Sequence, residues 1–271
     1  MPTDQELVDQ LEAVWSSIEK LGSGLSDAEW AAPTECPGWS VKDNVSHIIG
    51  IEAMSLGRAA PERELGDPPH VKNDIGRANE MWVDNLRDRS GPEVLDEYRN
   101  LTSERIAGLR ALDEAGFFAD SWTPAGPGTV RDLIPFRVFD SWVHEQDMRR
   151  AIHRPGDLDG PVARAAFERV ADRMGYVVGK KVNPPDGTSV VFDLVGPLAR
   201  PLVVGVDGGR AHTLDPPPAE PTVRLKMSDE TFCRLGCGRI DPAAALSDGR
   251  VVVSGDAALG LRVTESMNFL F

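Results

Sequence analysis

A change in the spacing of apolar residues near residue 183 constrains the fold of this 271-residue chain more than any other feature. Before it, apolar residues recur at helical spacing, and the first segment carries Leu7, Leu11, Val14, Ile18 and Leu21. After the Asn-Pro-Pro sequence at 183–185, they gather in short runs typical of strands. The sequence predicts an α+β fold: a helical domain over 1–182 and a smaller α+β domain over 183–271, with the boundary within 180–188.

Start and stop signals delimit the helices of the first domain. Thr3 and Glu6 form a capping box, and Ser40 caps a second helix that contains His47. Further helices are predicted through 82–86, from Pro92 to Leu109, from 129 to 152 with Pro135 near its start or at a kink, and through 162–174. Residues 122–128 are expected to form a loop. Several long helices with short connections predict a helical bundle.

The second domain is predicted from alternating short elements. Strands are expected at 189–195, 201–206, 222–227 and 251–254, with a turn at 207–210. Short helices are expected from Ser228, after Asp241 and after Asp256.

Charge and composition exclude several function classes. The formal net charge of −14 argues against binding to nucleic acid or anionic lipid, which requires clustered Lys and Arg. No uncharged apolar run is long enough to span a bilayer, and the N-terminus lacks the pattern of a signal peptide. The three cysteines do not form a disulfide framework. We therefore expect a cytoplasmic protein whose partners are small molecules.

Three side chains indicate a metal site. Asp140 and His144 are four residues apart in a predicted helix, which places them on one face. His47 from a second helix would complete a set of three ligands with one coordination position left open, as in catalytic sites. Zinc suits these ligands best, and nickel or ferrous iron also accept two imidazoles and a carboxylate.

Simpler interpretations compete with this one. Asp140 has Arg137 three residues before it and could pair with that residue alone. His47 lies among apolar residues and could be a core histidine bonded to a backbone carbonyl. Asp147 either orients the His144 imidazole or is a helix-surface charge next to Arg150.

Other candidate residues carry weaker signals. Cys233 and Cys237 are interpreted as small core thiols, and Cys36 either as a reactive thiol or as buried loop packing. Arg239 could bind a substrate carboxylate, although a C-capping or surface interaction is the simpler expectation. The sequence contains no glycine-rich phosphate loop, serine elbow or kinase signature.

Two segments carry a family resemblance. Residues 36–47 (CPGWSVKDNVSH) and 139–152 (FDSWVHEQDMRRAI) resemble the mycothiol-dependent maleylpyruvate isomerase family, which belongs to the DinB-like four-helix metalloenzymes of actinobacteria. The tail from residue 225 through 255–260 (GDAALG) is similar to its sterol-carrier-like C-terminal domain. The resemblance implies a DinB-like four-helix bundle followed by a sterol-carrier-like α+β domain.

The resemblance also implies a site and a reaction. It assigns zinc to His47, Asp140 and His144, and implies that a C-terminal arginine, mapped to Arg239, aids substrate binding. The characterised isomerase has Glu at the position of Asp140, so metal position or affinity can differ. Mycothiol would attack a small electrophile as thiolate, either isomerising a cis double bond by addition, rotation and elimination or staying in the product.

Two alternatives to this enzyme remain. In the first, the protein is a non-catalytic carrier of an apolar ligand, whose cavity would be lined by Phe192, Leu194, Val203 and Val204. In the second, the same metal site activates water in a hydrolase. The residues decide neither the electrophile nor the oligomeric state, and fold similarity does not fix a reaction.

Overall fold

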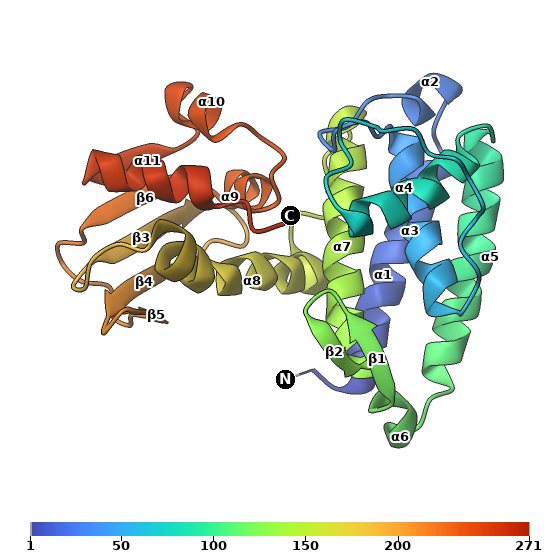
Figure 1. The fold of residues 1–271 in the computed structure, drawn as a ribbon, viewed down its shortest axis with the longest axis horizontal. Helices are drawn as coiled ribbons and strands as arrows, with labels where there is room; N and C mark the ends of the chain where they lie inside the picture. Colours follow the sequence, from blue (N-terminus) through green and yellow to red (C-terminus); the bar gives the residue numbers. More distant parts are fainter. Residues whose placement is uncertain (1, 271) are drawn as a thin grey trace. The chain divides into compact units, whose positions relative to one another are not determined.

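A four-helix bundle forms the core of the first part of the chain in the computed structural model, which describes residues 2–270 (Figure 1). Its long helices are α1 (Asp4–Gly22), α3 (Val41–Ser55), α5 (Gly91–Arg110) and α7 (Val130–Ala151). Both α1 and α3 contact both α5 and α7, which closes the bundle. Shorter helices complete this part: α2 (Asp27–Trp30), α4 (Asp74–Leu86) and α6 (Glu114–Phe117).

Capping boxes define where the long helices begin. The side chains of Thr3, Ser40, Ser90 and Thr129 each accept a hydrogen bond from the backbone N–H three residues later. The acidic side chain of that later residue accepts a hydrogen bond from the backbone N–H of the capping residue. This arrangement satisfies backbone donors that the first turn leaves without partners. The predicted starts of the first two helices are confirmed. Pro135 lies inside α7, beyond its first turn.

Polar bonds inside the bundle connect its helices in addition to apolar packing. The Trp15 indole on α1 donates to the Ser141 hydroxyl on α7 at 2.9 Å, and the Tyr98 hydroxyl on α5 donates to the Trp15 carbonyl at 3.2 Å. All three side chains are buried. Buried hydrogen bonds fix the register of neighbouring helices because unpaired polar groups are costly there.

The expected loop at 122–128 is part of a β-hairpin. Strand β1 (Asp120–Thr123) pairs antiparallel with β2 (Gly126–Thr129), and Thr123 lies opposite Gly126. The glycine and proline content of this segment hid the strand pattern, because neither residue favours strands. The hairpin leads directly into α7, whose N-cap is Thr129.

A mixed five-stranded sheet forms the second part of the chain. Its strands lie in the order β5–β4–β3–β6–β7, and only β3 and β6 are parallel. Helices of this part follow or precede the strands in the chain (Figure 1). The strands are β3 (Ser189–Val195), β4 (Leu202–Asp207), β5 (Arg210–Thr213), β6 (Val223–Ser228) and β7 (Val252–Gly255), and the helices are α8 (Gly160–Tyr176), α9 (Asp229–Gly236), α10 (Pro242–Ser247) and α11 (Ala257–Ser266), with a π-helix, η1 (Val177–Val182), after α8.

The described chain divides into two compact units between Gly156 and Asp157, earlier than the boundary predicted at 182/183. Helix α8 is the reason for the difference. Phe167 on α8 packs against Phe232, which in turn packs against Phe192 on β3, each pair with ring centroids 5.6 Å apart. Because α8 buries its apolar face in the second core, it belongs to the second unit even though its sequence pattern resembles that of the bundle helices.

No helix within residues 2–270 is both long and apolar enough to cross a membrane.

Candidate metal centre

Three donor side chains from α3 and α7 converge inside the bundle. His47 lies in the middle of α3, and Asp140 and His144 lie one turn apart on α7. One ligand atom from each residue lies within 4.8 Å of the other two. The Nε2 atom of His47 is 3.3 Å from the Oδ2 atom of Asp140, and the Nε2 atom of His144 is 3.6 Å from Oδ1. The structure therefore brings together the three ligands predicted from the sequence.

Arg137 pairs with the Asp140 carboxylate. Its Nη1 atom donates to Asp140 Oδ2 at 2.9 Å, and its Nε atom donates to Glu52 Oε1 at 2.6 Å. Burial would raise the pKa of Asp140, but the charge of Arg137 and the two nearby imidazoles hold that pKa well below its usual value. The carboxylate is ionised at neutral pH. The pairing expected from the sequence exists, and the carboxylate still lies beside both histidines, with Oδ1 3.5 Å from Nε2 of His47 and 3.6 Å from Nε2 of His144.

Asn44 fixes the tautomer of His144. The Asn44 amide nitrogen donates to the Ser40 carbonyl oxygen at 2.8 Å, and that oxygen can only accept. The Asn44 Oδ1 atom therefore faces His144, 2.6 Å from Nδ1, which must carry the hydrogen. In the neutral ring the lone pair is then on Nε2, the nitrogen that faces Asp140.

His47 is buried and held in its neutral form. Burial lowers its pKa, although the nearby Asp140 carboxylate acts in the opposite direction. Among residues 2–270, no hydrogen-bond partner is present for its Nδ1 atom. The expectation of a core histidine bonded to a backbone carbonyl is therefore not supported, and the ring is oriented by its neighbours: its centroid lies 4.7 Å from that of His144 and 5.0 Å from that of Trp39.

Trp39 covers the two histidines. Its ring centroid lies 5.7 Å from that of His144 as well, and its indole N–H donates to Glu80 at 2.9 Å. Glu80 is fully buried and also contacts His70 at 2.9 Å and Arg87 at 2.8 Å. These contacts hold the indole against the imidazole pair.

Asp140 is the most accessible member of the group. Both histidines are buried, whereas 29% of the Asp140 side-chain surface is accessible. A small molecule would therefore approach from the side of this carboxylate.

Asp147 lies beside both His144 and Arg150. Its Oδ2 atom lies 3.4 Å from His144 Nδ1, and its Oδ1 atom accepts a bond from Arg150 at 2.7 Å. The side chain is completely buried, so it is not a solvated helix-surface charge. Asn44 is closer to Nδ1 than Asp147 is, which makes the amide the main partner of His144.

Arg239 belongs to the second unit. It follows α9, and its Nη1 atom donates to the Cys237 carbonyl at 3.0 Å, the C-capping interaction expected from the residues alone. Its role toward a substrate stays a prediction. Cys233 and Cys237 are buried, as expected of core thiols, whereas Cys36 is partly exposed.

Sequence reasoning missed Asn44, Glu52, Trp39 and Glu80. Asn44 precedes His47 by three residues on the same helix, so helical spacing could have placed it beside the site. Glu52 and Glu80 are acidic residues on buried helix faces, a pattern that signals a buried partner. The partners themselves could not be read from the sequence.

Comparison with protein-family models identifies both parts of the chain. Residues 11–149 match the model described as mycothiol maleylpyruvate isomerase N-terminal domain, and residues 167–268 match the SCP-2 sterol transfer family. The second match begins inside α8, in accord with the assignment of that helix to the second unit.

Two relatives come from Mycobacterium tuberculosis: the uncharacterized protein MT0041 of strain CDC 1551 / Oshkosh and the uncharacterized protein Rv0036c of strain H37Rv. Each is 23% identical over 230 residues, covering 84% of this chain and 83% of the relative.

Two solved structures share the fold. A crystal structure of a histidine-to-alanine mutant of the mycothiol-dependent maleylpyruvate isomerase superposes with a TM-score of 0.59 at 15% identity and covers 93% of each chain. Another crystal structure of that isomerase gives a TM-score of 0.54 at 14% identity and covers 88% of this chain and 90% of the other. Residues 11–149 are half of the present chain, and on that match the protein belongs to the mycothiol maleylpyruvate isomerase N-terminal domain family.

Proposed function

We propose that this protein is a metal-dependent enzyme that uses a low-molecular-weight thiol, mycothiol, as the nucleophile toward a small electrophile. Zinc is the proposed metal, and His47, Asp140 and His144 are its proposed ligands. The observation that carries the proposal is the convergence of these three donor groups in a bundle of this family. The reaction is of the isomerase or S-transferase type, and the proposed location is the cytoplasm.

The site's own chemistry fits a cation. The ionised Asp140 carboxylate and the His144 Nε2 lone pair face each other at 3.6 Å, and no hydrogen of the neutral His144 ring lies between them. The neutral His47 ring also has one nitrogen with a lone pair, since burial lowers its pKa. Two neutral imidazoles and one carboxylate are ligands that zinc accepts.

Bound zinc would lower the pKa of a thiol, so that the sulfur is a thiolate at neutral pH. The chain's residues would supply the rest. Asn44 keeps the hydrogen of His144 on Nδ1, and Arg137 prevents the Asp140 carboxylate from rotating. Trp39 limits access of water to the histidines, so the thiol enters beside Asp140. Arg239 is the proposed binding residue for an anionic group of the electrophile.

Metal analysis of site variants tests the ligand set. We expect about one zinc ion per chain in the reconstituted protein and a large loss in the His47→Ala, Asp140→Asn and His144→Ala variants, because an open site needs all three protein ligands. The His212→Ala variant is the matched control, since that exposed histidine lies on β5 in the second unit. Full zinc content in His144→Ala would overturn the proposed ligand set.

Product analysis separates the reactions. Maleylpyruvate is the first electrophile to try, with mycothiol present or omitted. Full return of the thiol indicates an isomerase, and a thiol retained in the product indicates a transferase. Turnover that does not depend on thiol would instead support the hydrolase alternative.

The match to the SCP-2 sterol transfer family is the reason to test the carrier alternative. The four residues that would line its cavity, Phe192, Leu194, Val203 and Val204, are all buried, and Phe192 packs on Phe232 in the core. Native mass spectrometry before and after delipidation tests this alternative, because a carrier retains an apolar ligand without any metal.

A further inference from the structure

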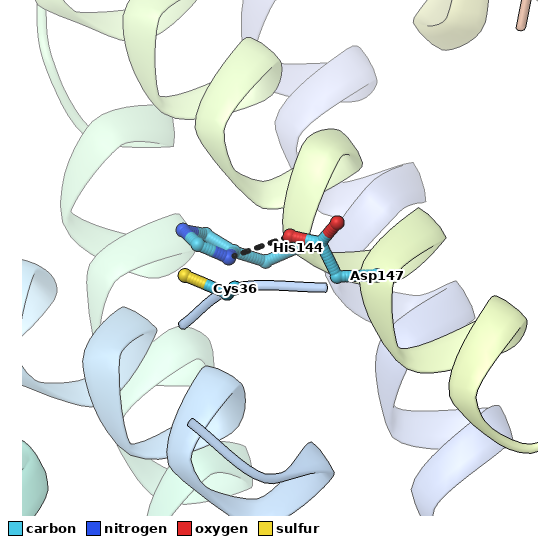
Figure 2. A group of neighbouring side chains, drawn as sticks. All are labelled: Cys36, His144 and Asp147. Carbon is cyan, nitrogen blue, oxygen red and sulfur yellow. Dashed lines mark ion pairs between the residues drawn. The ribbon is translucent and has the colours of Figure 1, made fainter. Parts of the chain in front are cut away.

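His144 belongs to a second group of donor atoms. One ligand atom each from Cys36, His144 and Asp147 lie within 4.8 Å of one another. Figure 2 shows the Cys36 side chain alongside the His144 ring and the Asp147 carboxylate at one edge of that ring. Cys36 is partly exposed in the loop before α3, whereas Asp147 is buried one turn after His144 on α7. A cation can therefore reach this group from the side of the sulfur.

Contacts of neighbouring residues hold Cys36 close to His144 and Asp147. Arg150 bonds to Asp147 at 2.7 Å and to Glu35 at 2.9 Å, which ties the residue before Cys36 to α7. The backbone N–H of Cys36 donates to the Thr34 hydroxyl at 3.2 Å. An ion pair and a hydrogen bond thus constrain the backbone just before Cys36.

The donor types of this group differ from those of the first. A thiolate is a soft ligand that favours thiophilic cations such as Cd²⁺ and Zn²⁺, while imidazole and carboxylate complete the site. The Cys36 thiol would release a proton as the cation binds, and the His144 hydrogen would move from Nδ1 to Nε2.

The two groups require the lone pair on different nitrogens of the His144 ring. Nδ1 is the His144 nitrogen that faces Asp147, at 3.4 Å, whereas Nε2 faces Asp140. A neutral imidazole has a single lone pair, and Asn44 keeps it on Nε2 by accepting the Nδ1 hydrogen. A cation bound by Cys36 and Asp147 would require the lone pair on Nδ1 and move the hydrogen to Nε2. His144 then has no lone pair on Nε2 to bind a cation in the first group.

We propose that Cys36, His144 and Asp147 form a second, thiophilic cation site that competes with the first site for His144. Binding at this site does not depend on the proposed function. Its consequence, inhibition of the enzyme by thiophilic metals through Cys36, rests on that function.

Titration of the full-length metal-free protein with Cd²⁺, in the absence of thiol, tests the site directly. The thiolate-to-cadmium charge-transfer band reports on sulfur ligation. We expect the band in the wild type and in His47→Ala, which leaves the second group intact. Cys36→Ser should lose it, and Asp147→Asn should need about tenfold more Cd²⁺, a difference of ~1.4 kcal/mol in binding.

Two outcomes would overturn the site. Persistence of the band in Cys36→Ser would assign it to the buried thiols, and Cys233→Ser is the control for that origin. Loss of the band in His47→Ala would mean that Cys36 binds metal together with the first group and that no separate site exists.

Zinc release tests the competition. Cd²⁺ added to zinc-loaded protein should displace more zinc from the wild type than from Cys36→Ser, and should inhibit thiol-dependent turnover more strongly. Equal displacement from both proteins would contradict the sharing of His144. If the wild type shows the Cys36-dependent band but never binds zinc at the first site, the proposed function fails while the second site stands.

Discussion

The Nδ1 atom of His144 lies 2.6 Å from the Oδ1 atom of Asn44, and this contact decides which nitrogen of the ring faces Asp140 with a lone pair. The amide can act in this way because its own nitrogen is bonded to the Ser40 carbonyl. Asn44, which donates to the N-cap residue of α3, thus sets which nitrogen of His144 on α7 carries the hydrogen.

Replacing Asn44 should weaken metal binding. Asn44→Ala removes the acceptor for the Nδ1 hydrogen, and loss of such a partner typically costs about 10–100-fold in metal affinity. Competition for zinc with a chromophoric chelator measures the effect. Ser46→Ala is the matched control, because this buried residue on the same helix bonds only to the Lys42 carbonyl among the bonds described. Equal zinc affinities in the two variants would refute the role of Asn44.

Replacing Glu52 should destabilise the fold. Glu52 is fully buried and pairs with Arg137 at 2.6 Å and with Arg105 at 3.3 Å. Glu52→Gln removes one of the two carboxylates that pair with the buried Arg137 guanidinium, and breaking a buried pair costs about 3–5 kcal/mol of the free energy of unfolding. Chemical denaturation measures the loss.

Glu104→Gln is the comparison for Glu52→Gln, since Glu104 pairs with Arg58 at the surface. Exposed pairs contribute about 0–1 kcal/mol. If both variants lose the same stability, the Glu52 pair is not a structural element of the bundle.

Glu80 should make stability depend on pH. Burial would raise its pKa, but bonds from His70 and Trp39 and the charge of Arg87 lower it below the ordinary value of 4.5. A carboxylate with a lowered pKa in the folded state contributes stability above its ordinary pKa and loses that contribution as pH falls through the folded value. The stability difference between the wild type and Glu80→Gln should therefore be largest near neutral pH and shrink below 4.5.

Denaturation curves recorded across this range give the difference for Glu80→Gln. Glu62→Gln, at an exposed position in the segment before α4, is the control. A constant difference for Glu80→Gln would contradict the assigned cause.

Gly38 should be intolerant of a side chain for two separable reasons. Its φ of +79° disfavours other residues, and a Cβ atom there would lie 2.4 Å from Nδ1 of His70. Gly57 has a φ of +74° but nothing within 4 Å of an added Cβ. Gly57→Ala should therefore lose about 1 kcal/mol from backbone strain, and Gly38→Ala clearly more.

The thermal unfolding midpoint compares the two alanine variants. Compared with His70→Ala alone, the double variant Gly38→Ala/His70→Ala should lose only the strain component, because the obstructing ring is absent from both. A larger loss would show that His70 is not what limits the size of residue 38.

Local patterns determined much of this protein. The caps at Thr3 and Ser40, the helical spacing around His47 and the four-residue spacing of Asp140 and His144 depend on residues close in sequence, so they are legible without a structure. The same is true of the strands at 189–195 and 223–228, which follow short-range alternation or apolar runs. The two family segments are likewise contiguous stretches of chain.

Only the tertiary structure decided what those residues meet. The sequence pattern of α8 is that of any amphipathic helix, and its membership of the second unit follows from the packing of Phe167 on Phe232. Glu52 and Arg137 are far apart in sequence, as are Asn44 and His144, yet their bonds hold the guanidinium that pairs with Asp140 and set the tautomer of His144. The reason is physical: helical periodicity fixes which face a residue occupies, whereas hydrogen bonds and ion pairs form only between atoms that packing brings within about 3–4 Å.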